Sequence, residues 1–187
     1  TFAVATHKAK VIGLIAEARS GKDTVFNIVK TLLPDKTVVR VAFGDAVKEE
    51  VAERHELSVE DIEDNKESFR NLLQAWGTDY RRVNDENYWI KKIKPQVDIL
   101  MSSADVVVFT DIRFLNEADY IKDKLKGDLI KITGKKERVL ESDHPSETEL
   151  KAIKPDWLLP NTGTISSPAE GVAFLLHDME IEDFSDE

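Results

Sequence analysis

The chain has 187 residues, and its 36 acidic side chains outnumber its 26 lysines and arginines, which gives a formal net charge of −10. With 41% hydrophobic residues, 33% charged residues and no cysteine, the composition predicts a globular chain without disulfides or thiolate metal sites. The acidic balance argues against nonspecific nucleic-acid binding, no apolar run approaches the ~20 residues of a membrane span, and no secretory signal pattern opens the chain, so we expect a cytoplasmic enzyme.

The negative charge is concentrated in two stretches of the chain. Residues 44–67 carry ten acids against three bases, and residues 178–187 carry six acids and no base. We expect both stretches to be solvated faces. The remainder is slightly positive and contains cationic side chains that are candidates for a local anion pocket: Arg19, Lys22, Arg70, Arg81, Arg82, Arg113 and Arg138.

The first half of the chain begins with alternating strand and helix patterns. The spacing of apolar residues predicts a buried strand at 11–15, a helix at 22–33, a strand at 37–43 and a helix at 46–56. From 58 to 103 the pattern is helical, with breaks near Gly77 and between 84 and 87. This block is too long for a plain crossover between strands, so we expect a helical insert over the edge of a sheet.

The second half of the chain resumes the alternation of strands and helices. Strands are predicted at 105–110, at 128–133 and near 157–159, and helices around 118–125 and at 168–179. Residues 134–150 are polar and predict an exposed excursion. The pattern predicts a single α/β domain with a mostly parallel five-stranded sheet and helices on both faces. Ligands bind in such folds beyond the carboxyl ends of the strands.

A phosphate-binding loop is predicted between the first strand and the first helix. Gly21 allows a tight turn at the positive end of the helix, and Lys22 follows it to reach outer phosphates. Two residues depart from the G-x-x-x-x-G-K-[ST] pattern, because Ala16 replaces the first glycine and Asp23 replaces the hydroxyl residue. An ordinary strand-to-helix turn is the alternative, but the flanking strand and helix favour the loop.

A second candidate site follows the strand at 105–110. Asp111 ends this strand, where a carboxylate can face the shell of a bound Mg²⁺, and Arg113 comes two residues later. The alternative is a helix cap with a surface ion pair. Given the phosphate loop, we expect Asp111 and Asp23 to hold Mg²⁺ through water.

Together with residues 18–24 and 110–117, four further stretches carry a family resemblance. They are residues 43–48, residues 70–79 with Arg81 and Arg82, residues 87–89 and residues 144–147. With them the sequence resembles the bacteriophage deoxynucleoside monophosphate kinases from about residue 11 to 149. In that family an aspartate at the position of Asp23 is usual.

The resemblance implies a three-layer P-loop nucleoside monophosphate kinase fold over residues 1–187. Residues 58–103 would form a helical acceptor-binding insert and residues 134–150 a lid. The implied reaction moves the γ-phosphoryl group of ATP, with Mg²⁺ as cofactor, onto a deoxynucleoside monophosphate (dNMP). The products would be ADP and a dNDP, for phage DNA precursor synthesis in the host cytoplasm.

The resemblance also implies a role for each matching residue. The ATP-binding residues would be Ala18, Arg19, Ser20, Gly21, Lys22, Asp23 and Thr24. The catalytic residues would be Lys22, Asp111, Arg113 and, in the lid, Arg138. The dNMP-binding residues would be Asp45, Lys48, Arg70, Trp76, Gly77, Thr78, Arg81, Arg82 and Trp89.

Several of these assignments have structural alternatives. Trp76 stands near two leucines and is equally suited to a core, and Arg70 can be a solvated arginine on a helix. Lys48 can pair with a neighbouring acid, and one of Arg81 and Arg82 can form a salt bridge. The roles of the residues in the His-Pro-Ser-Glu stretch, His144, Ser146 and Glu147, stay open.

The acceptor and the partners also stay open at this stage. A phosphomevalonate or dephospho-coenzyme A type of acceptor fits the same fold, and Ala16 leaves a non-catalytic nucleotide-binding module as a further alternative. We expect ATP and a dNMP as partners, without nucleic acid or membrane. The resemblance leaves a homodimer open.

Overall fold

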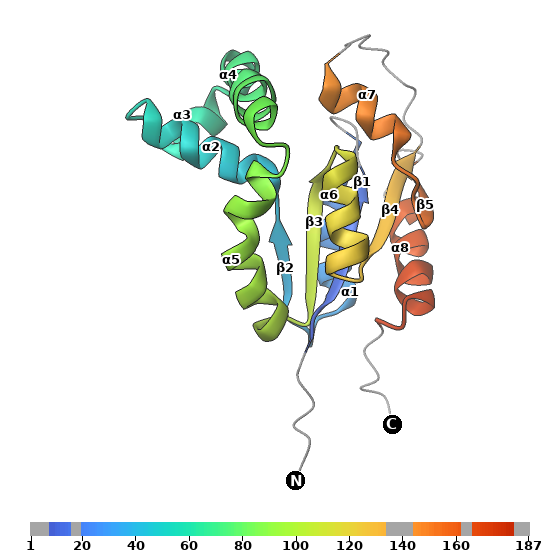
Figure 1. Ribbon diagram of the computed structural model, residues 1–187. Helices are drawn as coiled ribbons and strands as arrows, with labels where there is room; N and C mark the ends of the chain where they lie inside the picture. The colour runs from blue at the N-terminus through green and yellow to red at the C-terminus, as the bar shows by residue number, and fades with distance from the viewer. Residues whose placement is uncertain (1–7, 16–19, 134–143, 162–165, 182–187) are drawn as a thin grey trace. The chain divides into compact units, whose positions relative to one another are not determined.

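The structure is a computed structural model that describes residues 8–15, 20–133, 144–161 and 166–181 (Figure 1). The chain divides into two compact units, which we describe one at a time. Unit 1 comprises Thr1–Val41 and Val97–Glu187, and unit 2 comprises Ala42–Gln96. Within the described ranges, every helix is too short or too polar to cross a membrane.

Unit 1 is built on a five-stranded sheet in which all neighbouring strands are parallel, in the order β2-β3-β1-β4-β5. The strands are β1 (Lys10–Ile15), β2 (Val38–Val41), β3 (Val106–Ile112), β4 (Asp128–Thr133) and β5 (Trp157–Pro160). Almost all side chains of β1 and β3 are buried, as expected for central strands covered on both faces. The predicted parallel α/β sheet is therefore confirmed.

Helices cover both faces of this sheet (Figure 1). On one face lie α1 (Lys22–Leu32) and α8 (Ser166–Asp178), which share the main apolar core with the strands. On the other lie α6 (Leu115–Asp119) and the π-helical turn η2 (Tyr120–Lys124). A further helix, α7 (Pro145–Ala152), precedes β5.

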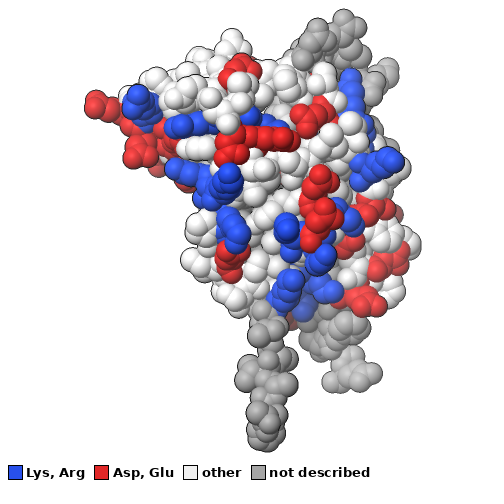
Figure 2. All heavy atoms as spheres, viewed as in Figure 1, with Lys and Arg blue, Asp and Glu red and all other residues white. Residues whose placement is uncertain are grey.

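Unit 2 is helical and has a small core of its own. It contains α2 (Phe43–Arg54), α3 (Val59–Asp64), α4 (Lys66–Gln74), the π-helix η1 (Ala75–Arg82) and the first part of α5 (Tyr88–Ser103). Its buried centre consists of Val51, Ala52 and Ile62, against which partly buried side chains of α2, α4 and η1 pack. The four acids of α3 are exposed, and Figure 2 shows acidic side chains gathered at the left tip of the visible face, where Figure 1 places α3.

Three predicted boundaries were wrong. The second strand ends at Val41, and Phe43 is the buried first residue of α2 rather than the end of a strand. No helix break occurs at Gly77, because α4 runs directly into η1 and a Cβ at Gly77 would lie 3.4 Å from Val47. The end of the predicted exposed excursion forms α7, whereas residues 134–143 lie outside the described part of the chain.

Candidate active site

The phosphate loop leads from β1 into the amino-terminal end of α1. Gly21 has φ = 91°, in the left-handed region that favours glycine, and it occupies the N-cap position, where it has no side chain to cap the helix. The first helical hydrogen bond runs from Val25 N to the Gly21 carbonyl over 3.0 Å. Because the amides of a first helical turn have no intrahelical acceptor, they suit an anion. Ala18 and Arg19 lie outside the described residues.

Asn161, which follows β5, contacts this loop from a distant part of the sequence. Its side-chain Nδ2 donates a hydrogen bond to the Ser20 carbonyl over 3.1 Å, and a Cβ at Gly21 would lie 2.6 Å from the same nitrogen. Asn161 was not among the predicted site residues. Since 141 residues separate it from Ser20, no local sequence pattern signals the contact.

The strand before the second candidate site contains a β-bulge. Gly13 of β1 pairs with Phe109 of β3, but Ile15 pairs with Ile112, so β3 has one more residue than β1 over this stretch. Bulges of this kind redirect side chains and are frequent beside active sites.

The bulge determines which face Asp111 occupies. Phe109 packs edge-on against Tyr120 of η2, and Ile112 lies 3.4 Å from the Cβ position of Gly13 on that same face. Thr110 and Asp111, between them, therefore turn toward the opposite face, which α1 covers. Asp111 is partly exposed, whereas Thr110 is fully buried and its hydroxyl has no hydrogen-bond partner among the described residues. Since parallel strands end at one edge, Asp111 lies at the edge where α1 begins.

The donor set suits Mg²⁺ held jointly with a nucleotide rather than a metal cage made by the protein alone. Within the described ranges, no group of three or more acidic or histidine side chains converges on one point. Mg²⁺ in kinases is commonly held by one or two carboxylates and the substrate phosphates, and Asp111 fits that requirement. Asp23 fits it less well, because its exposed carboxylate lies 3.9 Å from the Arg40 guanidinium.

Arg113 is held by acids from two other parts of unit 1. Its NH1 lies 3.5 Å from Oε1 of Glu147 in α7, and its backbone N–H donates to the buried Glu117 carboxylate over 3.0 Å. Glu117 also accepts the Phe114 N–H over 3.1 Å and so caps α6. The Asp-Ile-Arg and His-Pro-Ser-Glu stretches, which are about 30 residues apart, are thus joined by an ion pair, and Glu147 acquires a role that its sequence position did not show.

His144 stabilises the start of α7. Its Nδ1 accepts the Ser146 N–H over 3.2 Å and lies 2.7 Å from the Ser146 hydroxyl oxygen. The ring therefore acts as an N-cap for the helix that carries Glu147. Arg138, the predicted lid residue, lies outside the described part of the chain.

In unit 2 a buried carboxylate, Glu50, binds three side chains from the acceptor-binding segments. Its oxygens accept hydrogen bonds from Arg81 Nε (2.6 Å), Tyr88 OH (2.6 Å) and Trp76 Nε1 (3.2 Å). The Arg81 guanidinium also lies over the rings of Trp76, Tyr80 and Tyr88, at 5.4, 5.0 and 4.6 Å from their centroids. We call Glu50, Trp76, Arg81 and Tyr88 the Glu50 cluster.

The electrostatics of the Glu50 cluster favour an ionised carboxylate. Burial raises the pKa of Glu50. The hydrogen bonds from Tyr88, Arg81 and Trp76 together lower it by more than burial raises it, so the pKa lies below the ordinary 4.5. Burial and the same carboxylate raise the pKa of the Tyr88 phenol, which stays a hydrogen-bond donor. Glu50 was not predicted, since nothing in the sequence distinguishes it from the other acids of 44–67.

The remaining predicted acceptor residues of unit 2 differ in how fully they are engaged. Lys48 forms an ion pair with Glu63 and lies 3.7 Å from Asp45. Trp89 is 3% exposed, and its Nε1 donates to the Gly77 carbonyl over 2.8 Å, so its indole packs inside the unit. Gly77 is buried, Thr78 is partly buried, and Arg82 donates to the Glu86 carbonyl over 3.1 Å.

Arg70, on α4, differs from the other arginines of the predicted site. It is partly buried, and within the described ranges its side chain forms no hydrogen bond or ion pair. By contrast, Arg81 and Arg113 are paired with acids. A guanidinium that is partly removed from water and lacks a counter-ion is well suited to a phosphate ligand.

Comparison with known proteins identifies the kind of enzyme. The sequence model of a family described as phosphomevalonate kinase matches residues 15–127, which is more than half of the chain. A putative deoxynucleotide monophosphate kinase of Acanthamoeba polyphaga mimivirus is 33% identical over 184 aligned residues, covering 83% of this chain and 90% of the relative.

One solved structure supports the fold, and a second is reported beside it. The APS kinase of Mycobacterium tuberculosis in complex with AMPPNP and APS is 15% identical, covers 91% of this chain and 98% of its own, and has a TM-score of 0.54. The shikimate kinase of Aquifex aeolicus is 20% identical, covers 92% and 99%, and has a TM-score of 0.48. The chain therefore belongs to the phosphomevalonate kinase family, has a P-loop kinase fold and is an ATP-dependent phosphotransferase.

Proposed function

We propose that the acceptor of this kinase is a deoxynucleoside monophosphate. An oxygen of the acceptor phosphate attacks the γ-phosphorus of ATP, the bond from that phosphorus to the β–γ bridging oxygen breaks, and ADP leaves. The product is a deoxynucleoside diphosphate, a precursor of DNA. The name of the mimivirus relative supports this acceptor. The structural observation that carries the proposal is the partly buried Arg70, whose side chain has no partner among the described residues and which lies in the segment that resembles nucleotide kinases.

The residues of unit 1 would bind and activate ATP. Lys22 and the amides at the start of α1 would hold the phosphates and stabilise the charge that develops during transfer. Asp111 would hold Mg²⁺ together with the nucleotide, and the metal would neutralise phosphate charge. Arg113, oriented by Glu147, would add a positive charge at the same edge of the sheet. The catalytic role of Arg138 in a lid and the formation of a homodimer stay predictions.

The residues of unit 2 would bind the acceptor. Arg70 would hold its phosphate through a two-pronged guanidinium contact, with Arg82 as a second cation. Trp76 would form a wall for the base, because Glu50 fixes its indole nitrogen and its ring is only partly buried. Arg81 would keep Trp76 in place rather than bind phosphate, since Glu50 already neutralises it.

A phosphomevalonate-type acceptor is the second candidate, favoured by the description of the matching family. It also carries a phosphate, so Arg70 suits both acceptors. The aromatic surface of Trp76, which is partly exposed, and Tyr80, which is 51% exposed, favours a planar base over an aliphatic acceptor.

A coupled assay of ADP release with Mg-ATP tests the proposal. The panel contains dAMP, dGMP, dCMP, dTMP, 5-hydroxymethyl-dCMP, the ribonucleotides, phosphomevalonate and dephospho-coenzyme A. We expect turnover with some deoxynucleotides and its loss, by orders of magnitude, in Lys22→Ala. Turnover confined to phosphomevalonate or dephospho-coenzyme A would refute the dNMP assignment.

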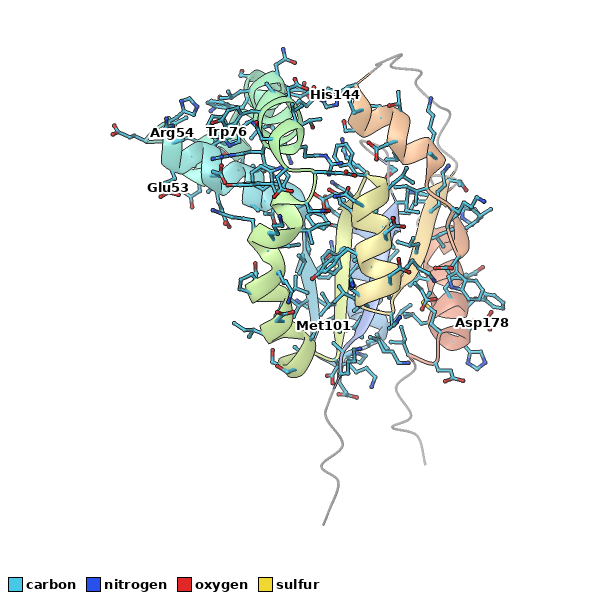
Figure 3. All side chains as sticks on the ribbon, in the orientation of Figure 1. Glu53, Arg54, Trp76, Met101, His144 and Asp178 are labelled. Atoms are coloured by element: carbon cyan, nitrogen blue, oxygen red, sulfur yellow. The ribbon has the colours of Figure 1, made fainter. Side chains whose placement is uncertain are left out.

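The Arg70→Ala variant tests the acceptor site itself. We expect the KM for the dNMP to rise by about tenfold or more and the KM for ATP to change little, since a charge-assisted contact contributes ~1.5–3 kcal/mol. Arg54→Ala is the matched control, because Arg54 is an exposed arginine at the end of α2 (Figure 3). An increase in the KM for ATP alone would show that Arg70 belongs to the other substrate.

A further inference from the structure

Asn161 is fixed at the carboxyl edge of the sheet by its own backbone. Its N–H donates to the Thr133 carbonyl at the end of β4 over 2.6 Å, which continues the pairing of β4 with β5 by one residue. Its side chain is partly buried. The position of the amide group is therefore set by the sheet.

The side chain of Asn161 connects this edge to the phosphate loop. In the sheet order, β4 lies between β1 and β5. Asn161, which follows β5, therefore reaches across the end of β4 to the loop that follows β1. Asn161 Nδ2 donates to the Ser20 carbonyl over 3.1 Å. The same nitrogen leaves no room for a Cβ at position 21, where the residue is glycine. The contact combines a hydrogen bond with close steric fit.

The hydrogen bond determines the direction of a loop amide. In a planar trans peptide the carbonyl and the N–H point in opposite directions. Holding the Ser20 carbonyl toward Asn161 therefore directs the Gly21 N–H away from Asn161. Gly21 is the left-handed residue at the N-cap of α1 and has no side chain to cap the helix, and backbone N–H groups at such a position suit phosphate. Because a glycine has a wide range of conformations, this peptide needs an external restraint to keep one orientation.

We propose that Asn161 is a positioning residue for the ATP phosphates. It fixes the peptide between Ser20 and Gly21, so that the Gly21 N–H faces the phosphate site before the nucleotide arrives. This inference depends only on the ATP-dependent phosphotransferase activity of the family and not on the identity of the acceptor.

The test measures phosphate binding without any acceptor. The affinities of wild type, Asn161→Ala and Asn161→Asp for AMPPNP with Mg²⁺ are measured by titration calorimetry, and inorganic tripolyphosphate is titrated in parallel. We expect Asn161→Ala to weaken the binding of both ligands by the same factor, about tenfold. The variant loses the hydrogen bond that holds the peptide between Ser20 and Gly21, and this peptide faces the phosphates that both ligands share. Asn161→Asp keeps the shape but loses the donor and adds a negative charge, so it should bind more weakly still, with a difference that shrinks at high salt.

The matched control is Asn65→Ala. The Asn65 amide also donates to a backbone carbonyl, that of Asp61, over 2.9 Å, but on the exposed surface of unit 2. We expect this variant to keep wild-type affinity within twofold and to have a melting temperature like that of Asn161→Ala.

Three results would overturn the proposal. They are unchanged affinity of both Asn161 variants, weakened binding of AMPPNP with unchanged binding of tripolyphosphate, and an affinity loss that disappears after correction for the folded fraction. If Asn161→Ala does not fold, the near-isosteric Asn161→Asp alone decides between these outcomes and the expected one. Since no acceptor is present, failure of the dNMP assignment leaves this test unaffected.

Discussion

The Glu50 cluster allows a quantitative prediction for the substitution Glu50→Gln. The carboxylate accepts hydrogen bonds from Arg81, Tyr88 and Trp76, and Lys92 Nζ lies 3.6 Å from it. Glutamine preserves the shape and one acceptor oxygen but removes the charge. Its NH₂ group replaces the second acceptor oxygen and cannot accept a hydrogen bond from the side chains that donate to Glu50. The guanidinium of Arg81, whose side chain is only 30% exposed, then lacks a counter-ion.

The expected cost follows from these contacts. Each hydrogen bond to a charged group contributes ~1.5–3 kcal/mol, and glutamine can replace only part of the set, so we expect a loss of about 2–4 kcal/mol in the free energy of unfolding. For a chain of this size that corresponds to a fall in the melting temperature of roughly 4–16 °C.

Urea unfolding followed by tryptophan fluorescence measures this loss, since Trp76 and Trp89 both lie in unit 2. The control is Glu53→Gln, an exposed acid one turn along α2 (Figure 3), for which we expect a change below ~0.5 kcal/mol. Equal stabilities of the two variants would refute the assignment of Glu50 as the centre of the unit's polar contacts.

Two further predictions concern acid sensitivity and backbone packing. Because the pKa of Glu50 lies below 4.5 in the folded chain, the unfolded state binds more protons as the pH falls through that range, so stability is full above about pH 4.5 and decreases toward pH 3. The urea midpoint measured from pH 7 to 3 should show this decrease, and Glu50→Gln should show less of it. Gly127→Ala should destabilise the chain by about 1–3 kcal/mol, because the new Cβ would lie 2.8 Å from the Val11 carbonyl oxygen. Gly77→Ala, with its nearest contact at 3.4 Å, should cost less in the same urea experiment.

The sheet was predictable because its signal is local. The strands β1 and β3 are buried on both faces and therefore appear in the sequence as short continuous apolar runs, and the helix after Gly21 begins at Lys22 as expected. The break expected at Gly77 was wrong because that glycine serves close packing against α2 rather than a turn.

The features that depend on pairing between distant segments were not predictable. The bulge that turns Asp111 toward α1 exists only in the register between β1 and β3. Glu50 and Glu53 are equivalent in the sequence, and only the folded position of α2 buries one and exposes the other. Trp76 and Trp89 were candidates of equal standing, but the indole of Trp89 is committed to the Gly77 carbonyl.

Unit 2 has a consequence for how enzymes of this kind diversify. It is one uninterrupted segment, Ala42–Gln96, and the contacts of Glu50 all come from within it. Substitutions that reshape its aromatic surface therefore leave the strands and the phosphate loop unaltered. With the acceptor bound by unit 2, as proposed above, a lineage can acquire a new acceptor by changing fewer than a third of its residues, while the residues proposed to bind ATP are inherited intact.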